Sequence, residues 1–379
     1  GIIPAMIYYG LQILHPSIFL PACIVICAII SLATGSSWTT SATVGIALIG
    51  IGKVLGIPIG MVAGAVISGA YFGDKLSPLS DTTNLAPAMA GGELFSHIRY
   101  MSLTTIPSIV ITLIVFLILS LTQETTGQAD TLTLMAAIKE KFTINGWLFL
   151  VPATVILLIV KKSPPLIALL VGTLMGGIFA LLFQSDILLE ITQSSTLTSE
   201  VAYRAIMDAI SVSTEITTSN ALLNDLFTSG GMEGMLGTIW LIICAMVFGG
   251  IMDAIGALER ISNALLNWAQ TTFQLFASTV ASCLAINLTA SDQYLSIVIP
   301  GKMFAKAYKD RKLAPENLSR TLEDSGTVTS VLIPWNTCGA YQSGVLGVGV
   351  GEYFIYAIFN WISPFMTLLY AAFDIKIKA

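Results

Sequence analysis

The residues best suited to chemistry lie in a polar stretch, Gly73–Pro87, that interrupts an apolar part of the chain. It contains two aspartates, a lysine, four hydroxyl side chains and an asparagine, and its candidate site residues are Asp74, Ser80, Asp81, Thr82 and Asn84. Carboxylate, hydroxyl and amide oxygens are the hard ligands that small cations prefer. Burial favours the neutral form of a carboxyl group, so an aspartate there can also hold a proton. The stretch is therefore suited to binding a small cation or a proton.

Three further stretches supply similar side chains. Gly35–Ser41 is rich in small hydroxyl residues, Ala290–Gln293 contains one aspartate, and Asp324–Ala340 contains a second proline-broken segment. Their candidate ion ligands are Ser37, Thr39, Asp292, Asp324, Asn336 and Thr337. The predicted centre is Asp81, because it lies close to a proline and between hydroxyl residues. The rest of the predicted oxygen cage is Thr82, Asn84, Asn336 and Thr337.

Two charged residues near the polar stretches, Lys75 and Glu323, need an interpretation of their own. Lys75 can neutralise Asp74 as a structural pair, or Asp74 can take part in ion binding. Glu323 follows a basic segment closely, and we interpret it as solvated. The alternative for Gly73–Pro87 as a whole is a polar loop outside the membrane.

The composition is that of a membrane protein. Charged residues make up 10% of the chain, against about 25% in soluble domains. The mean hydropathy is +0.84. A membrane-spanning helix needs about 20 apolar residues, and the charge-free runs of that order are Tyr100–Thr122, Gly234–Met252, Thr271–Ser291 and Tyr353–Phe373. We predict an all-α polytopic membrane protein. The five cysteines and two histidines lack neighbours for catalysis or metal binding, so we do not expect an enzyme.

The polar stretches must interrupt the helices that carry them. Pro78 cannot donate a backbone hydrogen bond and should open its helix. Opened backbone within a membrane survives only beside protein or water, and ionisable residues at that depth usually mark an ion path. Pro16–Gly52 has no charge over 37 residues, about 55 Å as one helix. We expect it to form a re-entrant hairpin with its tip near Ser37, and Thr271–Gly301 to form another with its tip near Ser291.

The basic residues predict the orientation. Lys302–Arg320, read as a loop, carries six Lys and Arg residues, which are typical of the cytoplasmic side. The same side then holds the carboxyl terminus with Lys376 and Lys378.

With that orientation, the order of span, hairpin, broken helix and span occurs twice with opposite direction. The predicted organisation is a first inverted repeat over residues 1–122, a connector over 123–145 and a second inverted repeat over 146–379. The spans Gly146–Val160 and Leu166–Phe183 have no partners in the first repeat, so we expect its amino-terminal part to lie outside this numbering. Inverted repeats with discontinuous helices indicate a secondary transporter with a site at the membrane midplane.

The polar stretches also carry a family resemblance. Gly-Asp-Lys-Leu-Ser-Pro-Leu-Ser-Asp-Thr-Thr-Asn from Gly73, Gly-Ser-Ser-Trp-Thr-Thr-Ser from Gly35 and Pro-Trp-Asn-Thr-Cys-Gly-Ala from Pro334 resemble the NhaC family of sodium/proton antiporters. That family belongs to the ion-transporter group of inverted-repeat carriers. The resemblance implies sodium-for-proton exchange in a prokaryotic plasma membrane. We expect this exchange to proceed by alternating access, with sodium held at the cage predicted around Asp81.

Several alternatives stay open at this stage. Some relatives exchange malate or lactate with coupling to sodium, and the motifs do not separate these activities. An intramembrane aspartyl protease would need glycine at position 71, where this chain has Tyr71. A channel is the third alternative, although two occluding hairpins favour a carrier. We expect sodium and protons as substrates, no cofactor, lipid as the surrounding partner and no nucleic acid. A homodimer is one oligomeric state compatible with this class.

Overall fold

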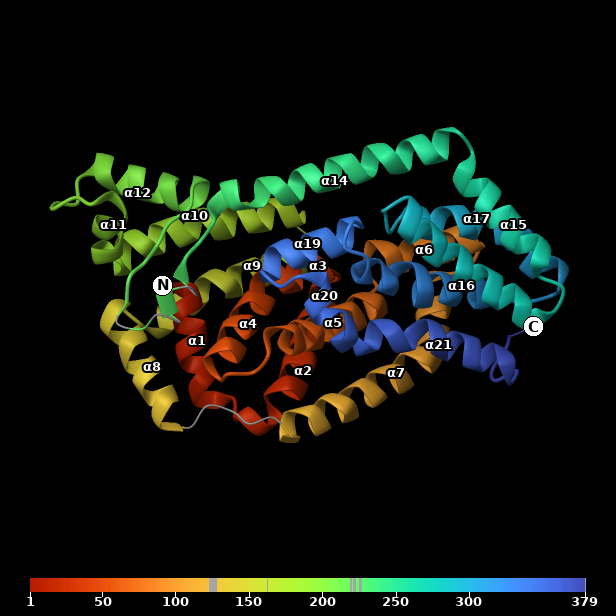
Figure 1. The fold of residues 1–379 in the computed structure, drawn as a ribbon, viewed down its shortest axis with the longest axis horizontal. Coiled ribbons are helices and arrows are strands. Elements are labelled where there is room, and N and C mark those ends of the chain that lie inside the picture. The colour runs from red at the N-terminus through yellow and green to blue at the C-terminus, as the bar shows by residue number, and fades with distance from the viewer. Residues whose placement is uncertain (123–127, 162, 219, 221–222, 225–226, 379) are drawn as a thin grey trace. The chain divides into compact units, whose positions relative to one another are not determined.

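The computed structural model describes residues 1–122, 128–161, 163–218, 220, 223–224 and 227–378. Over these residues the chain is helical, with α, 3₁₀ and π segments, and its β structure is a single bridge between Thr214 and Ser229. This confirms the all-α prediction. The chain packs as two units (Figure 1). Unit 1 comprises Gly1–Phe19, Thr43–Pro58 and Ser120–Ile239, and unit 2 comprises Leu20–Ala42, Ile59–Leu119 and Trp240–Ala379.

Unit 1 is built from apolar helices with short loops. α1 packs on α4 and α8, α9 packs on α10, and α11 packs on α12. Their bounds are α1 Ile2–Ile13, α4 Ile46–Val54, α8 Gln128–Lys141, α9 Leu150–Val160, α10 Pro165–Phe183, α11 Ser185–Thr192 and α12 Ser199–Ser211. α8 falls within the predicted connector, and its Lys141 forms an ion pair with Glu190 at 2.6 Å.

Unit 2 holds all the candidate site residues. Its core forms where α6, α16, α17, α18 and α21 meet, around buried side chains that include Phe276, Phe304 and Leu322. The bounds in this unit are α2 Phe19–Thr34, α3 Ser37–Thr40, α5 Ile59–Leu76, α6 Asp81–Ala90, α7 Leu94–Thr122, α15 Ala257–Trp268, α16 Thr272–Thr289, α17 Leu295–Asp310, α18 Pro315–Leu322, α19 Thr337–Leu346, α20 Val350–Tyr353 and α21 Ile358–Ala372. α14, Gly231–Ala254, runs from unit 1 into unit 2.

Five helices in the described chain are long and apolar enough to cross a membrane, or up to seven if each of two bent helix pairs is one span. The five are Pro16–Thr34, Leu94–Thr122, Leu166–Phe183, Gly231–Ala254 and Thr272–Thr289. The predicted spans at Tyr100–Thr122, Gly234–Met252 and Leu166–Phe183 are therefore confirmed as apolar helices. The last predicted span is bent by 52° between Val350–Tyr356 and Ile358–Ala372.

Helix breaks lie where the polar stretches predicted them. α5 ends at Leu76, four residues form a turn, and α6 begins at Asp81 with Ser80 as its N-cap. In the second half, α19 begins at Thr337 with Asn336 as its N-cap. α6 and α19 are both 10 residues long and both end at a left-handed glycine, Gly91 or Gly347. A positive φ costs little only in glycine, so each helix stops there.

The hairpin segments are also broken near the predicted tips. α2 is separated from α3 at Gly35, whose φ is 69°, and α16 is separated from α17 near Ser291, whose φ is 59°. Whether these segments re-enter the membrane stays a prediction.

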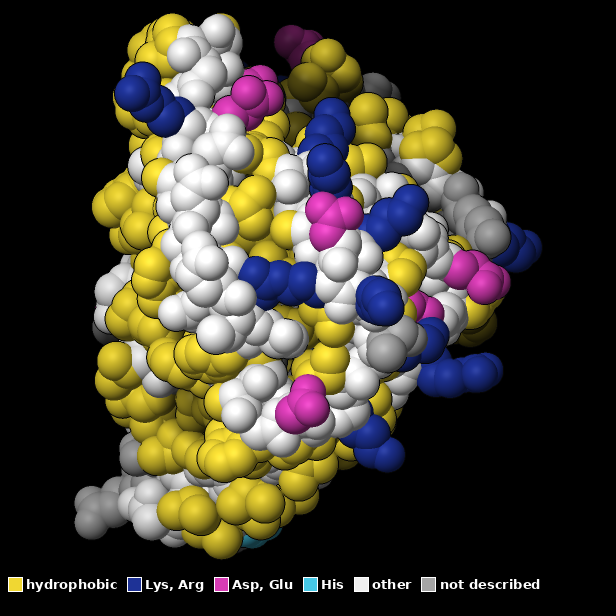
Figure 2. All heavy atoms as spheres, turned by 90° about the vertical axis from the view of Figure 1, so that its right-hand side faces the viewer, with side chains coloured by type: hydrophobic (Ala, Val, Ile, Leu, Met, Phe, Trp, Pro, Cys, Tyr) yellow, Lys and Arg dark blue, Asp and Glu magenta, His cyan; other side chains and the backbone are white. Residues whose placement is uncertain are grey.

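The prediction that Lys302–Arg320 forms a loop is wrong. α17 continues to Asp310 and α18 begins at Pro315, so most of it is helical. Arg320 is fully buried. Its guanidinium lies over the ring of Tyr100, 4.6 Å from the centroid, and near Phe276 and Tyr370. Figure 2 looks at unit 2 from the side where α15, α17 and the carboxyl terminus lie in Figure 1. Lys and Arg side chains outnumber acidic ones on this face.

Candidate ion-binding site

The most deeply buried charges in the predicted site are Asp324 and Lys75. Asp324 lies in a π-helical segment, Glu323–Thr327, that follows α18, and Lys75 lies in the last turn of α5. Their side chains form an ion pair and are both 0% exposed. The pairing corrects the interpretation of Lys75 as the partner of Asp74. Removing one member of such a pair would leave an uncompensated buried charge.

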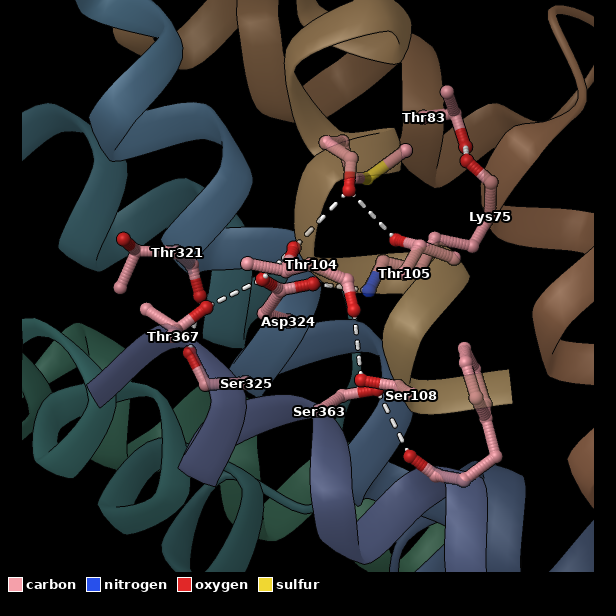
Figure 3. Close-up of polar contacts among 12 residues, drawn as sticks. Lys75, Thr83, Thr104, Thr105, Ser108, Thr321, Asp324, Ser325, Ser363 and Thr367 are labelled. Carbon is pink, nitrogen blue, oxygen red and sulfur yellow. Dashed lines mark hydrogen bonds and ion pairs between the residues drawn. The ribbon is translucent and has the colours of Figure 1, made fainter. Parts of the chain in front are cut away.

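Hydroxyl groups complete the surroundings of Asp324 (Figure 3). Its Oδ2 accepts hydrogen bonds from Thr104 of α7, at 2.8 Å, and from Thr367 of α21. Both carboxylate oxygens are thus occupied, one by the lysine and the other by two hydroxyls. Sequence reasoning missed Thr104 and Thr367. The signal for Thr104 was its spacing with Ser108 and Thr112, which places three hydroxyl residues on one face of an apolar helix.

Asp74 is tied to the first predicted hairpin tip. Its Oδ2 accepts hydrogen bonds from the backbone N–H of Ser37, at 3.0 Å, and from the Ser37 hydroxyl, at 2.7 Å. All the groups involved are buried. Thr39, also predicted as a ligand, is buried two residues further on, with its backbone N–H donating to the Ser36 hydroxyl. The structure thus brings Ser37 and Asp74 together, as a junction between α3 and the end of α5.

Asp81 has a different environment, because it is the first residue of α6 and is exposed. The Ser80 hydroxyl caps the helix and lies 3.2 Å from the hydroxyl of buried Thr82. Asn84 folds back and donates to the carbonyls of Pro78 and Ser80, at 3.0 and 2.7 Å. Free N–H groups and the helix dipole favour negative charge at this end of a helix. Among the described residues, Asp81 forms no ion pair.

The second-half candidates form their own cluster around the start of α19. Asn336 donates from Nδ2 to the backbone carbonyl and the side-chain oxygen of Asn287, both at 3.2 Å. The Thr337 N–H donates to the Ser291 carbonyl at 3.0 Å, which ties the second predicted hairpin tip to the second break. Asp292 accepts a hydrogen bond at 2.9 Å from the N–H of Leu295, the first residue of α17.

The two clusters meet without a direct hydrogen bond between their predicted ligands. α6, which begins at Asp81, packs against α17, which follows Asp292 closely. The rings of Trp38 and Tyr341 stack with centroids 4.0 Å apart, which joins the first hairpin tip to α19. Within the described chain, no hydrogen bond links Asp81, Thr82 or Asn84 to Asn336 or Thr337. The five-residue oxygen cage therefore stays a prediction.

Glu323 contradicts the interpretation that it is solvated. It is 0% exposed, because the π-helical segment continues directly from the buried helix α18. Neither carboxyl oxygen has a hydrogen-bond partner among the described residues, and the Thr327 hydroxyl also lacks one. Sequence reasoning underestimated this residue because the neighbouring basic segment was expected to be a loop.

Apolar helices of membrane length, helix breaks at polar stretches and buried charges within unit 2 define a multi-pass α-helical membrane protein. The chain belongs to the Na+/H+ antiporter family, whose model matches residues 69–375. It is 38% identical over its full length to the Na+/H+ antiporter NhaC of Alkalihalophilus pseudofirmus, covering 79% of that protein. It is 36% identical to the Na+/H+ antiporter NhaC of Bacillus subtilis, over 97% of this chain and 79% of that one.

A third relative is named for a different activity. The malate-2H+/Na+-lactate antiporter of Bacillus subtilis is 37% identical over 96% of this chain and 74% of its own length. The relatives confirm the resemblance to the NhaC family. They are transporters, and they include the organic-acid exchanger class that the motifs left open.

Proposed function

We propose that this chain exchanges Na+ for H+ across a prokaryotic plasma membrane by alternating access. The family match and the two NhaC relatives support the activity. The observation that carries the proposal is Asp81, an exposed carboxylate without an ion-pair partner in the described chain, at the start of a discontinuous helix. A carboxylate in that position can bind a cation or a proton from water.

Asp81 suits the exchanging role better than Asp74 of the first half or Asp324 of the second half. Asp324 is neutralised by Lys75 and bonded by two threonines. Asp74 is bonded twice by Ser37. Asp81 has neither restraint, and Thr82 and Ser80 place hydroxyl oxygens beside it. In this proposal Na+ bound near Asp81 gains further oxygens from Thr82, Asn84, Asn336 and Thr337 when the two clusters close on it.

The mechanism rests on the paired architecture of unit 2. A hairpin segment contacts a helix break in each half, through Ser37 with Asp74 and through Ser291 with Thr337. We take these as corresponding parts of two inverted repeats, residues 1–122 and 146–379, around one site. The basic face in Figure 2 supports a cytoplasmic position for α17 and the carboxyl terminus.

Purified protein in sealed proteoliposomes tests the function. An imposed Na+ gradient should drive proton movement in the opposite direction, and Asp81→Asn should abolish it while the protein still inserts and elutes as a single species. Asp310→Asn, at the exposed end of α17, is the matched control and should exchange at the parental rate. If Asp81→Asn exchanges normally and a correctly folded Asp324→Asn does not, the exchanging group belongs to the second repeat.

The same vesicles address organic-acid exchange, which the malate/lactate relative makes the second candidate. A carboxylate substrate needs a cation or free backbone N–H groups. In unit 2, Lys75 is engaged by Asp324 and Arg320 is enclosed by aromatic rings. We therefore expect neither malate nor lactate to change the Na+-dependent proton flux. A flux that requires either acid would favour the second function.

A further inference from the structure

An apolar cavity of about 440 Å³ lies in unit 2 beside the second helix break. This volume falls within the range of about 300–1,000 Å³ that is usual for small-molecule sites. Three walls enclose the cavity: α16, the break around Pro334, and α21 with the short helical segment before it. Leu284, Ile333 and Leu368 each belong to one of these walls. Among the described residues that line the cavity, none carries a charge.

The irregular backbone of two walls explains why a cavity forms here. Pro334 has no N–H to donate, and the chain around it is not helical between Leu332 and Thr337. The last span is bent by 52°, and Phe354 and Trp361 line the cavity from the two sides of the bend. The third wall, α16, is one uninterrupted helix. Because a break and a bend face a regular helix, side chains do not fill the space between them.

The polar atoms of the lining residues are already engaged within the protein. Nε1 of Trp335 donates to the Leu288 carbonyl at 2.8 Å, and Nε1 of Trp361 donates to the Phe354 carbonyl at 2.6 Å. The Thr329 hydroxyl both donates and accepts a hydrogen bond within the protein. The side chains of the described lining therefore offer an occupant no free donor or acceptor, and the cavity favours hydrocarbon.

The position of the cavity indicates the source of that hydrocarbon. α16 is apolar and long enough to cross a membrane, and so is the bent last span as a pair of helices. Leu288, Trp335 and Phe365 line the cavity and are 48%, 48% and 62% exposed, so the cavity is open to the surroundings of these helices. In a multi-pass membrane protein those surroundings are lipid tails, which are as apolar as leucine side chains.

We propose that this cavity binds an acyl chain of a membrane phospholipid, and that the chain restrains the second helix break. Ile333, Pro334 and Trp335 of the cavity wall directly precede Asn336 and Thr337, where α19 begins. A chain in the cavity adds van der Waals contacts to this segment, which an empty cavity would forfeit. The inference does not depend on which ions the protein exchanges.

Photolabelling tests whether the cavity is occupied. Vesicles of phosphatidylethanolamine and phosphatidylglycerol containing the protein receive a trace of phosphatidylcholine with a diazirine midway along one acyl chain, and mass spectrometry locates the adducts. Adducts should form at Leu284 and at the other cavity walls, at a higher density than on the exposed side chains of α14. Leu368→Trp places an indole ring in the cavity and should abolish the cavity adducts. Leu369→Trp, at an exposed neighbouring position that does not line the cavity, is the matched control and should keep them.

Hydrogen–deuterium exchange tests whether the chain restrains the break. The backbone amides of residues 330–338 should exchange more slowly in the vesicles than in detergent depleted of lipid. In Leu368→Trp they should exchange slowly in both, because the indole ring takes the place of the acyl chain. Leu369→Trp should behave like the parental protein.

The contrary outcomes are equally defined. Cavity labelling no denser than labelling on α14, or equal loss of adducts in Leu368→Trp and Leu369→Trp, would overturn the inference. Labelling by a diazirine fatty acid but not by the phospholipid would also overturn it, since a free acid would then be the occupant. Equal amide exchange with and without lipid in the parental protein would refute the restraint of the break.

A second variant covers the case in which Leu368→Trp does not fold. Leu284→Trp fills the same cavity from the α16 wall and should also abolish the cavity adducts. Parental labelling at the other two walls in a correctly folded Leu284→Trp would overturn the inference.

Discussion

At the scale of single residues, the four acidic side chains near the helix breaks differ in their partners. Asp324 has a lysine and two threonines, Asp74 has one serine that bonds it twice, Asp81 is exposed, and Glu323 is buried without hydrogen bonds in the described chain. These differences assign different roles to chemically similar groups. Asp324 and Asp74 are engaged in contacts within unit 2, and we propose that the exposed Asp81 exchanges ions.

The Lys75–Asp324 pair yields a stability prediction. Asp324→Asn leaves the Lys75 ammonium buried without its counter-charge, which should destabilise the fold by about 3–5 kcal/mol. The double variant Lys75→Met with Asp324→Leu removes both charges and should recover most of this loss. Thermal melting of the detergent-solubilised protein measures both effects. If Asp324→Asn and the double variant both melt at the parental temperature, the pair does not stabilise unit 2.

At the scale of elements, the helix breaks could be predicted because their causes are local. Pro78 and its polar neighbours open the helix that ends at Leu76, and Asn336 follows Pro334 in the same way. The helical state of Lys302–Arg320 could not be predicted from its charge. α17 is amphipathic, with Phe304 and Tyr308 in the core and the lysines outside, so the charges alone do not distinguish this helix from a loop.

Hydrogen-bond and ion-pair partners that come from distant helices could not be predicted from the sequence either. Thr104, Thr367 and Lys75 converge on Asp324 from α7, α21 and α5 because of how these helices pack. Spacing within a segment shows which residues share a face, but it does not show which other helix that face meets. The burial of Glu323 was missed because the basic segment before it was expected to be a loop, whereas α18 is a buried helix.

Close helix packing gives a prediction at this scale. A Cβ atom added at Gly69 of α5 would lie 2.3 Å from the backbone carbonyl oxygen of Ile24 in α2. Because a backbone atom cannot move independently, Gly69→Ala should force the two helices apart and lower the melting temperature. At Gly250 of α14 nothing lies within 4 Å, so Gly250→Ala should leave the melting temperature unchanged or raise it slightly. Equal melting temperatures for the two variants would contradict tight α2–α5 packing.

At the scale of the whole molecule, the sequence predicts the class and the family, and the inverted arrangement stays a prediction. The similar helices α6 and α19, each ended by a left-handed glycine, support a repeat. The two packing units interleave along the chain, so they do not correspond to residues 1–122 and 146–379. Two repeats that exchange segments can form packing units that interleave along the chain. Whether the repeats are inverted is shown only by the side of the membrane on which their loops lie.

The sidedness can be measured at exposed positions that follow the corresponding helices α6 and α19 of the two proposed repeats. Glu93 follows Gly91 after α6, and Gly351 follows Gly347 after α19; both are exposed. Cysteines introduced there can be labelled with a membrane-impermeant thiol reagent in intact cells and in inside-out vesicles. Cys244 is the exposed one of the five native cysteines, so Cys244→Ser provides the background.

Inverted repeats predict that Glu93→Cys is labelled from the cytoplasm and Gly351→Cys from outside. Lys312→Cys, between α17 and α18, is the cytoplasmic reference. If Glu93→Cys and Gly351→Cys react from the same side, the repeats are not inverted and the proposed symmetric site is wrong.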